Sequence, residues 1–316
     1  MQAPTNGGAW PHTPVLYQQV LSALNPGAGS RIIDGTVGAG GHAWGLLDAS
    51  NPDGLLLGLD RDPQALALAE QRLEPFGQRI VLRQGNYANM QKFAATLGWE
   101  HVHAVLLDLG LSSMQLDQAE RGFSIRRDGP LDMRFDPGQV TSAEDLVNES
   151  PPEELEQIIR TFGEEPRARR IVRAIVAARP IRTTSELANI VAGAVGGAGR
   201  RIHPATRTFQ ALRIAVNEEL ENLSQGLEQA LTLLVPGGRL AVISFHSLED
   251  RIVKLTFRRE SQDCICPPRQ PVCTCDHHAR VRVLTKKPIG PDDEEIQANS
   301  RARSARLRVA ARLPLA

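Results

Sequence analysis

The chain has 316 residues, 41% of them hydrophobic, which is enough for one large domain or two smaller ones with a real core. Its 36 basic and 36 acidic residues balance, so net charge points to no class of partner. No apolar run approaches the roughly 18 residues of a membrane span, and residues 1–10 lack the charged and apolar regions of a secretory signal. All four cysteines lie between Cys264 and Cys275, which favours a reduced, cytoplasmic protein over a disulfide framework.

Short apolar runs alternate with helical patterns over residues 16–107, and this alternation predicts an α/β fold. We expect strands over residues 31–34, 55–59, 80–83 and 102–107. We expect four helices in this region. One ends near residue 24, one begins after residue 42, and two cover residues 63–73 and 90–97.

A glycine-rich loop follows the first predicted strand. That strand ends at Asp34, and residues 35–41 contain four glycines before a helical pattern begins. Strand, glycine loop and helix in this order are typical of a Rossmann-type nucleotide site, because glycine lets the backbone approach a ligand closely. Taken alone, the loop is also compatible with a turn that binds no ligand.

Three acidic residues end predicted strands. Asp60 follows the second strand at the distance where an acid binds ribose hydroxyls, in nicotinamide and S-adenosylmethionine enzymes alike. Asp108 ends the fourth strand. Because ligands of open α/β sheets bind outside the carboxyl ends of the strands, we expect Asp34, Asp60 and Asp108 to project into one crevice. Any one of them alone would more simply be a cap or turn acid.

The middle of the chain differs in pattern. Residues 121–134 fit neither helix nor strand, which leaves a functional loop and a mobile linker as open alternatives. Residues 142–205 are helical in pattern, with capping-box sequences at Ser142 and Ser150, so we expect a helical domain inserted into the α/β unit.

Charge is unevenly distributed in this insert. Residues 144–165 contain eight acids and one arginine, whereas residues 167–213 contain ten arginines and one acid. The basic stretch suits a phosphate backbone. The alternative is that the two runs pair with each other as a solvated surface.

A single long helix with an apolar stripe is expected from residue 206, with Asn217 on its solvent or crevice face. It is followed by the turn Pro236-Gly237-Gly238 and a fifth strand ending near Phe245. That order is found in class I methyltransferases and is not typical of nicotinamide enzymes, so it favours S-adenosylmethionine.

Two features near the end of the chain stay open. The pairs Cys264-x-Cys266 and Cys273-x-Cys275 resemble a zinc knot, but their spacing is unusual, so we favour an unmetallated loop and assign no metal ligand. Residues 301–312 contain five arginines and no acid, and either contact nucleic acid or form a basic edge strand.

Taken together, these motifs resemble the bacterial small-subunit ribosomal RNA (cytosine-N4) methyltransferase family, known as RsmH or MraW. The matching segments are residues 12–16, 34–42, 107–117, 121–124, 128–134, 203–210 and 244–254. The resemblance implies a class I, Rossmann-like methyltransferase domain formed by residues 1–117 and 206–316. It also implies an inserted loop and helical substrate-recognition domain over residues 118–205.

The resemblance further implies S-adenosylmethionine as cofactor and a cytidine in the decoding centre of 16S ribosomal RNA, within the small ribosomal subunit, as substrate. No DNA or membrane partner is expected. The cofactor-binding residues implied by motif match are Gly40, Gly41, His42, Asp60, Tyr87, Asp108 and Gln115. Tyr87 stands where the family often has phenylalanine, and it keeps an aromatic ring.

The chemistry expected is direct methyl transfer to an exocyclic amine. An acceptor for the amine protons would favour the nucleophilic form of the amine, and we assign this catalytic role to Asp108, Ser112 and Ser113. No cysteine lies near the strand ends, which argues against methylation of carbon 5. The target base must be unstacked to react.

Three other functions are considered. A DNA amino-methyltransferase should carry an Asp/Ser/Asn-Pro-Pro-aromatic motif after the fourth strand, where this chain has Asp108-Leu109-Gly110-Leu111. A nicotinamide dehydrogenase leaves the arginine-rich stretch unexplained. A non-catalytic ribosome-assembly factor would not need three aligned carboxylates.

Overall fold

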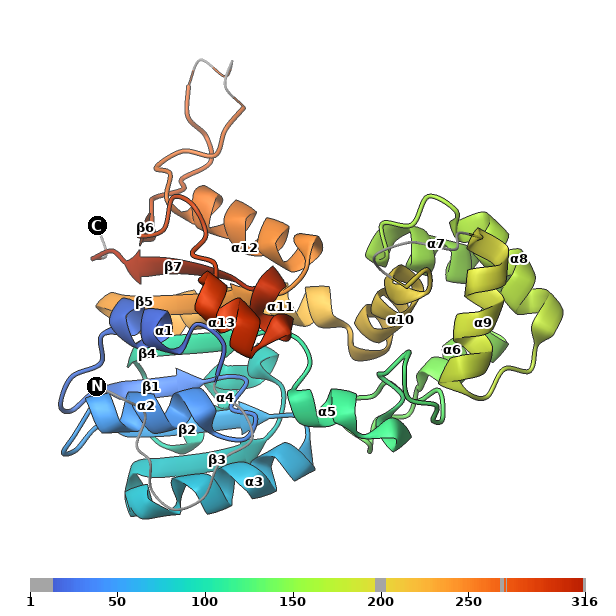
Figure 1. Cartoon of the computed structure of the whole chain (residues 1–316). Coiled ribbons are helices and arrows are strands. Elements are labelled where there is room, and N and C mark those ends of the chain that lie inside the picture. The colour runs from blue at the N-terminus through green and yellow to red at the C-terminus, as the bar shows by residue number, and fades with distance from the viewer. Residues whose placement is uncertain (1–13, 197–202, 268–269, 271, 315–316) are drawn as a thin grey trace. The chain divides into compact units, whose positions relative to one another are not determined.

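The computed structural model describes residues 14–196, 203–267, 270 and 272–314 (Figure 1). The chain divides into two compact units, the first formed by Met1–Gly110 and Asn222–Ala316 and the second by Leu111–Glu221.

The first unit contains a seven-stranded sheet in the order β3-β2-β1-β4-β5-β7-β6. Neighbours among β1 to β5 are parallel, whereas β7 is antiparallel to both β5 and β6. The strands are β1 Arg31–Asp34, β2 Leu55–Asp60, β3 Ile80–Gln84, β4 Val102–Asp108, β5 Leu234–Ser244, β6 Val281–Val283 and β7 Arg306–Arg312. The predicted Rossmann-like α/β sheet is therefore confirmed.

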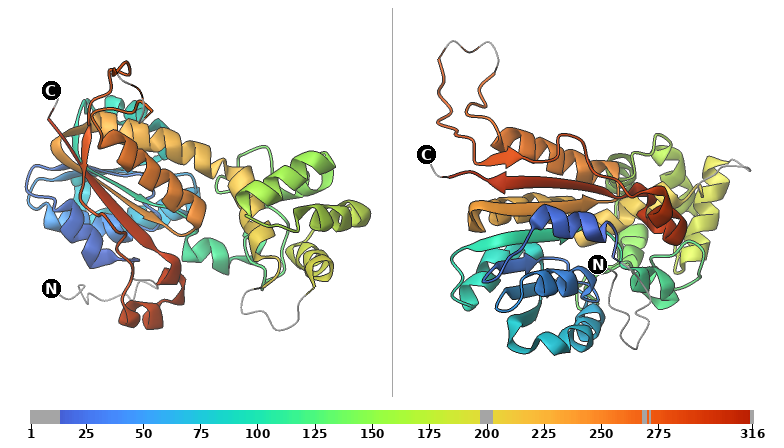
Figure 2. Two further views of the ribbon diagram at one scale, coloured as in Figure 1. Left: turned by 90° about the horizontal axis from the view of Figure 1, so that it is seen from above. Right: turned by 60° about the vertical axis from the view of Figure 1, so that its left-hand side comes forward.

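Helices cover both faces of this sheet (Figure 2). Successive strand residues point to opposite faces. Thus Ile32 and Leu106 join a core with α1, α2 and α3, whereas Ile33 and Leu107 join a core with α4, α11 and α12. The helices and short 3-10 turns are α1 Tyr17–Leu24, α2 Gly41–Ala49, α3 Pro63–Leu73, η1 Glu74–Arg79, η2 Tyr87–Asn89, α4 Met90–Thr96, α11 Glu219–Leu233, α12 Ser247–Glu260, α13 Asp293–Ala298 and η4 Ser300–Ser304.

The second unit is helical and has its own apolar core. Each of the helices α6 to α10 contributes to this core, for example through Leu155, Ile171 and Leu212. The elements are α5 Ser113–Asp117, η3 Ala119–Arg121, α6 Ala143–Glu149, α7 Pro152–Phe162, α8 Ala168–Ala178, α9 Thr184–Val195 and α10 Thr206–Asn217. Within the part of the chain that the structure describes, no helix is long and apolar enough to cross a membrane.

This compact unit includes more residues at both ends than the predicted insert of residues 118–205. Leu111 and Leu116, at the start of the unit, pack against the same core, and α10 packs on α6 and α7. Burial of these apolar side chains assigns α5 and α10 to the helical unit. The role of residues 118–205 in substrate recognition stays a prediction.

The irregular segment between η3 and α6 is packed rather than loose. Phe123 and Met133 are buried in the core of the second unit. The Asn217 side chain accepts a hydrogen bond from the Phe135 amide (2.8 Å) and donates one to the Met133 carbonyl (2.7 Å). These contacts do not fit a mobile linker. The prediction that Asn217 faces solvent or a crevice is wrong, because its side chain is fully buried by this segment.

Two further local predictions are wrong, and one of the two alternatives for residues 301–312 is excluded. The single helix expected from residue 206 is two helices, because Glu218 adopts a left-handed conformation (φ 53°) between α10 and α11. Ser150 caps the end of α6 instead of starting α7, which begins at a proline. The last strand, β7, is not an edge strand: it lies between β5 and β6, and its buried Arg308 pairs with Asp250 (2.7 Å).

Candidate active site

The strand-end carboxylates of the first unit lie on neighbouring strands. Asp34 is aligned with Gly58 of β2 and Leu106 of β4. Asp60 and Asp108 each lie two residues further along their own strands. Because the side-chain period of a strand is two, all three carboxylates belong to the sheet face covered by α1, α2 and α3. The predicted grouping of these acids at one edge of the sheet therefore matches the strand register.

The glycine loop is tied to this edge by its backbone. The Gly38 amide donates to Asp60 Oδ2 (2.9 Å), and the Asp62 amide donates to Asp60 Oδ1 (2.9 Å). Gly38 and Gly40 have φ angles of 52° and 79°, the left-handed region that favours glycine. A Cβ on Gly41 would lie 2.5 Å from Pro14 Cγ, so a larger residue does not fit at the start of α2 without movement.

His42 and Asp108 form the most direct contact among the predicted site residues of the first unit. His42 Nε2 lies 3.5 Å from Asp108 Oδ2, and the imidazole is buried and stacked on the Tyr17 ring (centroids 6.0 Å apart). Neither ring nitrogen of His42 has a hydrogen-bond partner among the described residues, and the same holds for Asp108 Oδ1. Buried polar atoms without partners are rare in folded proteins, so these atoms are available to a ligand.

Burial strongly raises the pKa of two of the carboxylic acids. It raises the pKa of Asp34 to about 7, although His42 and the Thr36 amide act in the opposite direction. Burial likewise raises the pKa of Asp60 to about 6, opposed by the amides that donate to it. Asp34 Oδ2 lacks a hydrogen-bond partner within the described residues. A cationic ligand would relieve this electrostatic cost by favouring the ionised carboxylates.

Tyr87 lies at the start of η2, separated from β3 by Gly85 and Asn86. Its ring packs against α11, where a Cβ on Gly226 would come within 2.5 Å of Tyr87 Cδ2. The ring is thus held by the core of the first unit. Contact with a cofactor base stays a prediction.

Ser112, Ser113 and Gln115 belong to the second unit. The Gln115 amide donates to Ser112 Oγ (3.1 Å), and the Ser112 amide donates to Gln115 Oε1 (3.1 Å). This reciprocal pair is a capping box at the start of α5, of which Ser113 is the first residue. The side chains of Ser112 and Gln115 therefore have a local structural role. The catalytic roles of the two serines and the cofactor-binding role of Gln115 remain predictions.

Two residues of the site were not assigned from the sequence. The strand pattern places Asp34 in the crevice but predicts no role for it, although an acid at the end of the first strand is a usable signal. Thr36 Oγ1 accepts a hydrogen bond from the Asp108 amide (2.7 Å) and so fixes the end of β4 against the glycine loop. No sequence pattern distinguishes this threonine from an ordinary loop residue.

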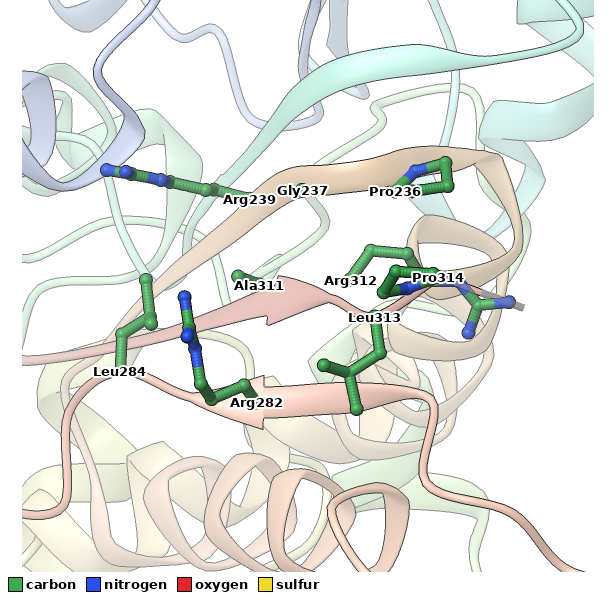
Figure 3. Close-up of a pocket in the computed structure, with 9 residues that line it drawn as sticks. All are labelled: Pro236, Gly237, Arg239, Arg282, Leu284, Ala311, Arg312, Leu313 and Pro314. Carbon is green, nitrogen blue, oxygen red and sulfur yellow. The ribbon is translucent and has the colours of Figure 1, made fainter. Parts of the chain in front are cut away.

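A cavity of about 390 Å³ lies elsewhere on the first unit (Figure 3). Its lining includes Arg239, Arg282 and Arg312, around the start of β5 and the end of β7. Asp108 is aligned with Ile243, at the opposite end of β5. The cavity is therefore separate from the acidic edge, and we assign it no part in the site.

The arginine-rich stretch is only partly neutralised. In the second unit, Arg213 pairs with Glu219 (2.8 Å) and Arg207 lies 3.8 Å from Glu165. On α8, Arg169, Arg170 and Arg173 are exposed on the face opposite the buried stripe. None of these three side chains makes an ion pair or hydrogen bond within the described residues. Pairing between the acidic and basic runs therefore accounts for only some of the arginines.

The sheet order, the glycine loop and the strand-end acids define a Rossmann-like methyltransferase fold. Comparison with known proteins then identifies the family. The chain belongs to the MraW methylase family, whose model matches residues 9–313. This family uses S-adenosylmethionine.

Curated relatives match nearly the whole chain. The ribosomal RNA small subunit methyltransferase H of Dehalococcoides mccartyi is 52% identical over 304 residues, covering 96% of this chain and 87% of the relative. That of Syntrophotalea carbinolica is 53% identical over 307 residues, covering 96% and 98%. Among solved structures, an rRNA methylase from Streptococcus thermophilus has a TM-score of 0.42 and 12% identity over 94% of each chain. That structural likeness is too distant to bear on function.

Proposed function

We propose that the protein transfers a methyl group from S-adenosylmethionine to the exocyclic N4 amine of a cytidine in the decoding centre of 16S ribosomal RNA, in the small ribosomal subunit and in the cytoplasm. The relatives named as small-subunit ribosomal RNA methyltransferases support the substrate class. The observation that carries the chemistry is Asp108, a carboxylate at the end of β4 with one oxygen free of hydrogen bonds within the described part of the chain.

The acidic edge fits the proposed cofactor. S-adenosylmethionine carries a sulfonium and an ammonium, and the buried Asp34 oxygen without a partner among the described residues offers an acceptor for a cation. Asp60 suits ribose hydroxyls, since it ends β2 and is already oriented by the Gly38 amide. The proposed cofactor contacts are Gly40, Gly41, His42, Asp60, Tyr87, Asp108 and Gln115.

The cofactor supplies a methyl group that is already reactive, so the task of the protein is to orient the amine and accept its proton. The amine lone pair of cytosine is delocalised into the ring. An acceptor for an N–H bond would favour the nucleophilic form, and Asp108 Oδ1 is such an acceptor. We assign supporting roles to Ser112 and Ser113, which follow Asp108 in the chain. All four cysteines lie within residues 264–275, away from the strand ends in sequence, so no cysteine is assigned to attack carbon 6.

The substrate is proposed to be held by the exposed arginines of α8. Arg169, Arg170 and Arg173 project from one helix face without acidic partners among the described residues. Such a face binds phosphates with little dependence on base sequence. Selection of the base must therefore come from the site itself.

The test is methylation of small ribosomal subunits purified from a strain that lacks the enzyme, followed by mass spectrometry of the digested nucleosides. N4-methylcytidine formed by the wild type and lost in Asp108→Asn is expected. Duplex DNA serves as the control substrate and should stay unmodified. Formation of 5-methylcytidine, or of a methylated adenine, would contradict the proposal.

A further inference from the structure

The four cysteines of the chain converge in the segment between α12 and β6. The described residues of this segment extend away from the sheet in Figure 1. All four Sγ atoms lie within 4.8 Å of one another. The Sγ–Sγ distances are 3.5 Å for Cys264–Cys273, 4.0 Å for Cys266–Cys273, 3.6 Å for Cys273–Cys275 and 3.9 Å for Cys264–Cys275.

These separations have the size expected for four thiolates around one metal ion. With Zn–S bonds of about 2.3 Å, the edges of a tetrahedron of sulfurs are about 3.8 Å long. A disulfide would instead bring two sulfurs to about 2.05 Å. The four cysteines are free thiols, and no disulfide joins them.

Nearby groups define the ligand set. The Ile265 amide donates to Cys275 Sγ (3.4 Å), which is the kind of outer contact that orients a metal-bound thiolate. His277 follows the last cysteine closely, but its Nε2 lies 3.1 Å from the Arg259 carbonyl, at the base of the segment. The group of close potential ligands contains the four cysteines and no histidine, so the ligand set consists of four thiolates.

The described residues of the segment include two exposed apolar side chains that could otherwise have formed a core. Ile265 and Val272 are exposed, at 38% and 69% of their surface. The base of the segment is held by Arg280, which pairs with Glu260 (2.6 Å). Small segments without a core commonly depend on a structural metal for their fold.

We propose that Cys264, Cys266, Cys273 and Cys275 bind one Zn²⁺ ion. This ion links the two cysteine pairs, which lie between α12 and β6. This differs from the sequence prediction, which assigned no metal ligand because C-x-C pairs are unusual. The spatial arrangement removes that objection, since each pair contributes both of its sulfurs to the same group. Four sulfur ligands leave no coordination position for a substrate, so the site is structural rather than catalytic.

The first test uses the full-length wild type, purified under reducing conditions and dialysed against metal-free buffer. We expect about one zinc per chain by elemental analysis. Exchange for Co²⁺ should give the charge-transfer and d–d absorption of tetrahedral cobalt thiolate. Because the chain has no other cysteine, the number of thiols that react with Ellman's reagent reports this site alone, and it should rise when zinc is removed.

Variants identify the ligands. Cys264→Ser and Cys273→Ser should each lower zinc retention by about 10–100-fold or more. His278→Ala, in the same segment but outside the cysteine group, should keep the wild-type zinc content. Zinc retained by both serine variants would overturn the proposal. So would a reduced wild type that holds neither zinc nor Co²⁺, or one that holds iron or disulfides instead. Each of these readouts is independent of methyl transfer.

Discussion

The stability of Asp34→Asn relative to the wild type should rise between pH 5 and pH 8 in the free protein. Burial raises the pKa of Asp34 from 3.8 to about 7. Between pH 3.8 and about 7, the Asp34 carboxyl group is protonated in the folded state and ionised in the unfolded state. The free energy of unfolding therefore falls as the pH rises through this range. At about 1.4 kcal/mol per pH unit, the free energy of unfolding is lower by roughly 4 kcal/mol at pH 8 and by roughly 2 kcal/mol at pH 5 than at a pH where both states are protonated.

The measurement is urea unfolding of wild type and Asp34→Asn at pH 5 and pH 8, without cofactor. A buried asparagine brings its own cost, but that cost is the same at both pH values, so the change in the mutational difference isolates the carboxylate. We expect this change to be roughly 2–3 kcal/mol in favour of the variant at pH 8. Glu70→Gln, at an exposed position on α3, should show no such change. Equal differences at both pH values would refute the account of Asp34 as a buried acid with a raised pKa.

Three further predictions concern the proposed function. Asp60→Ala should weaken S-adenosylmethionine binding by about 1–3 kcal/mol in calorimetry, because ribose hydroxyls lose their acceptor. Asp108→Asn should slow single-turnover methylation by about 10²–10⁴-fold at saturating cofactor while its melting temperature stays normal. Charge reversal at Arg169, Arg170 and Arg173 should weaken binding to small ribosomal subunits, reduce its dependence on salt, and leave cofactor affinity unchanged.

Each of these has an outcome that would contradict it. Unchanged cofactor affinity in a folded Asp60→Ala protein would remove this residue from the binding site. If extra cofactor restored the rate of Asp108→Asn, the residue would act in binding rather than in positioning the amine. Wild-type binding by the arginine variant, with an unchanged salt slope, would mean that α8 is an ordinary solvated surface.

Much of the first unit could be predicted because its signals are local. The apolar runs before Asp34, Asp60 and Asp108 predict buried strands, and the glycines after Asp34 predict the turn into α2. All of these elements are confirmed. The strand-end rule for α/β sheets then places the acids at one edge without any tertiary information.

The errors occur where distant contacts decide the local structure. Nothing near Glu218 in the sequence indicates a helix break, which accompanies the packing of Asn217 against residues 133–135. The arginines of β7 suggested an exposed strand, but Asp250 of α12 neutralises Arg308 in the interior. Similarly, the spacing of the cysteine pairs does not show that all four sulfurs lie close together, because this depends on the three-dimensional path of the chain.

The position of β7 has a consequence for the order in which the sheet is completed. It is the last strand in the chain but the sixth in the sheet, and β6 joins the sheet only through it. Pairing of Arg239 with Ala311 closes a loop of about seventy residues, which is slow to form compared with local contacts. While a ribosome is still synthesising the residues before β7, strand β5 is therefore an open edge. Unpaired edges of this kind are prone to associate with other chains, so the growing polypeptide has its greatest need of chaperone protection just before its final strand emerges.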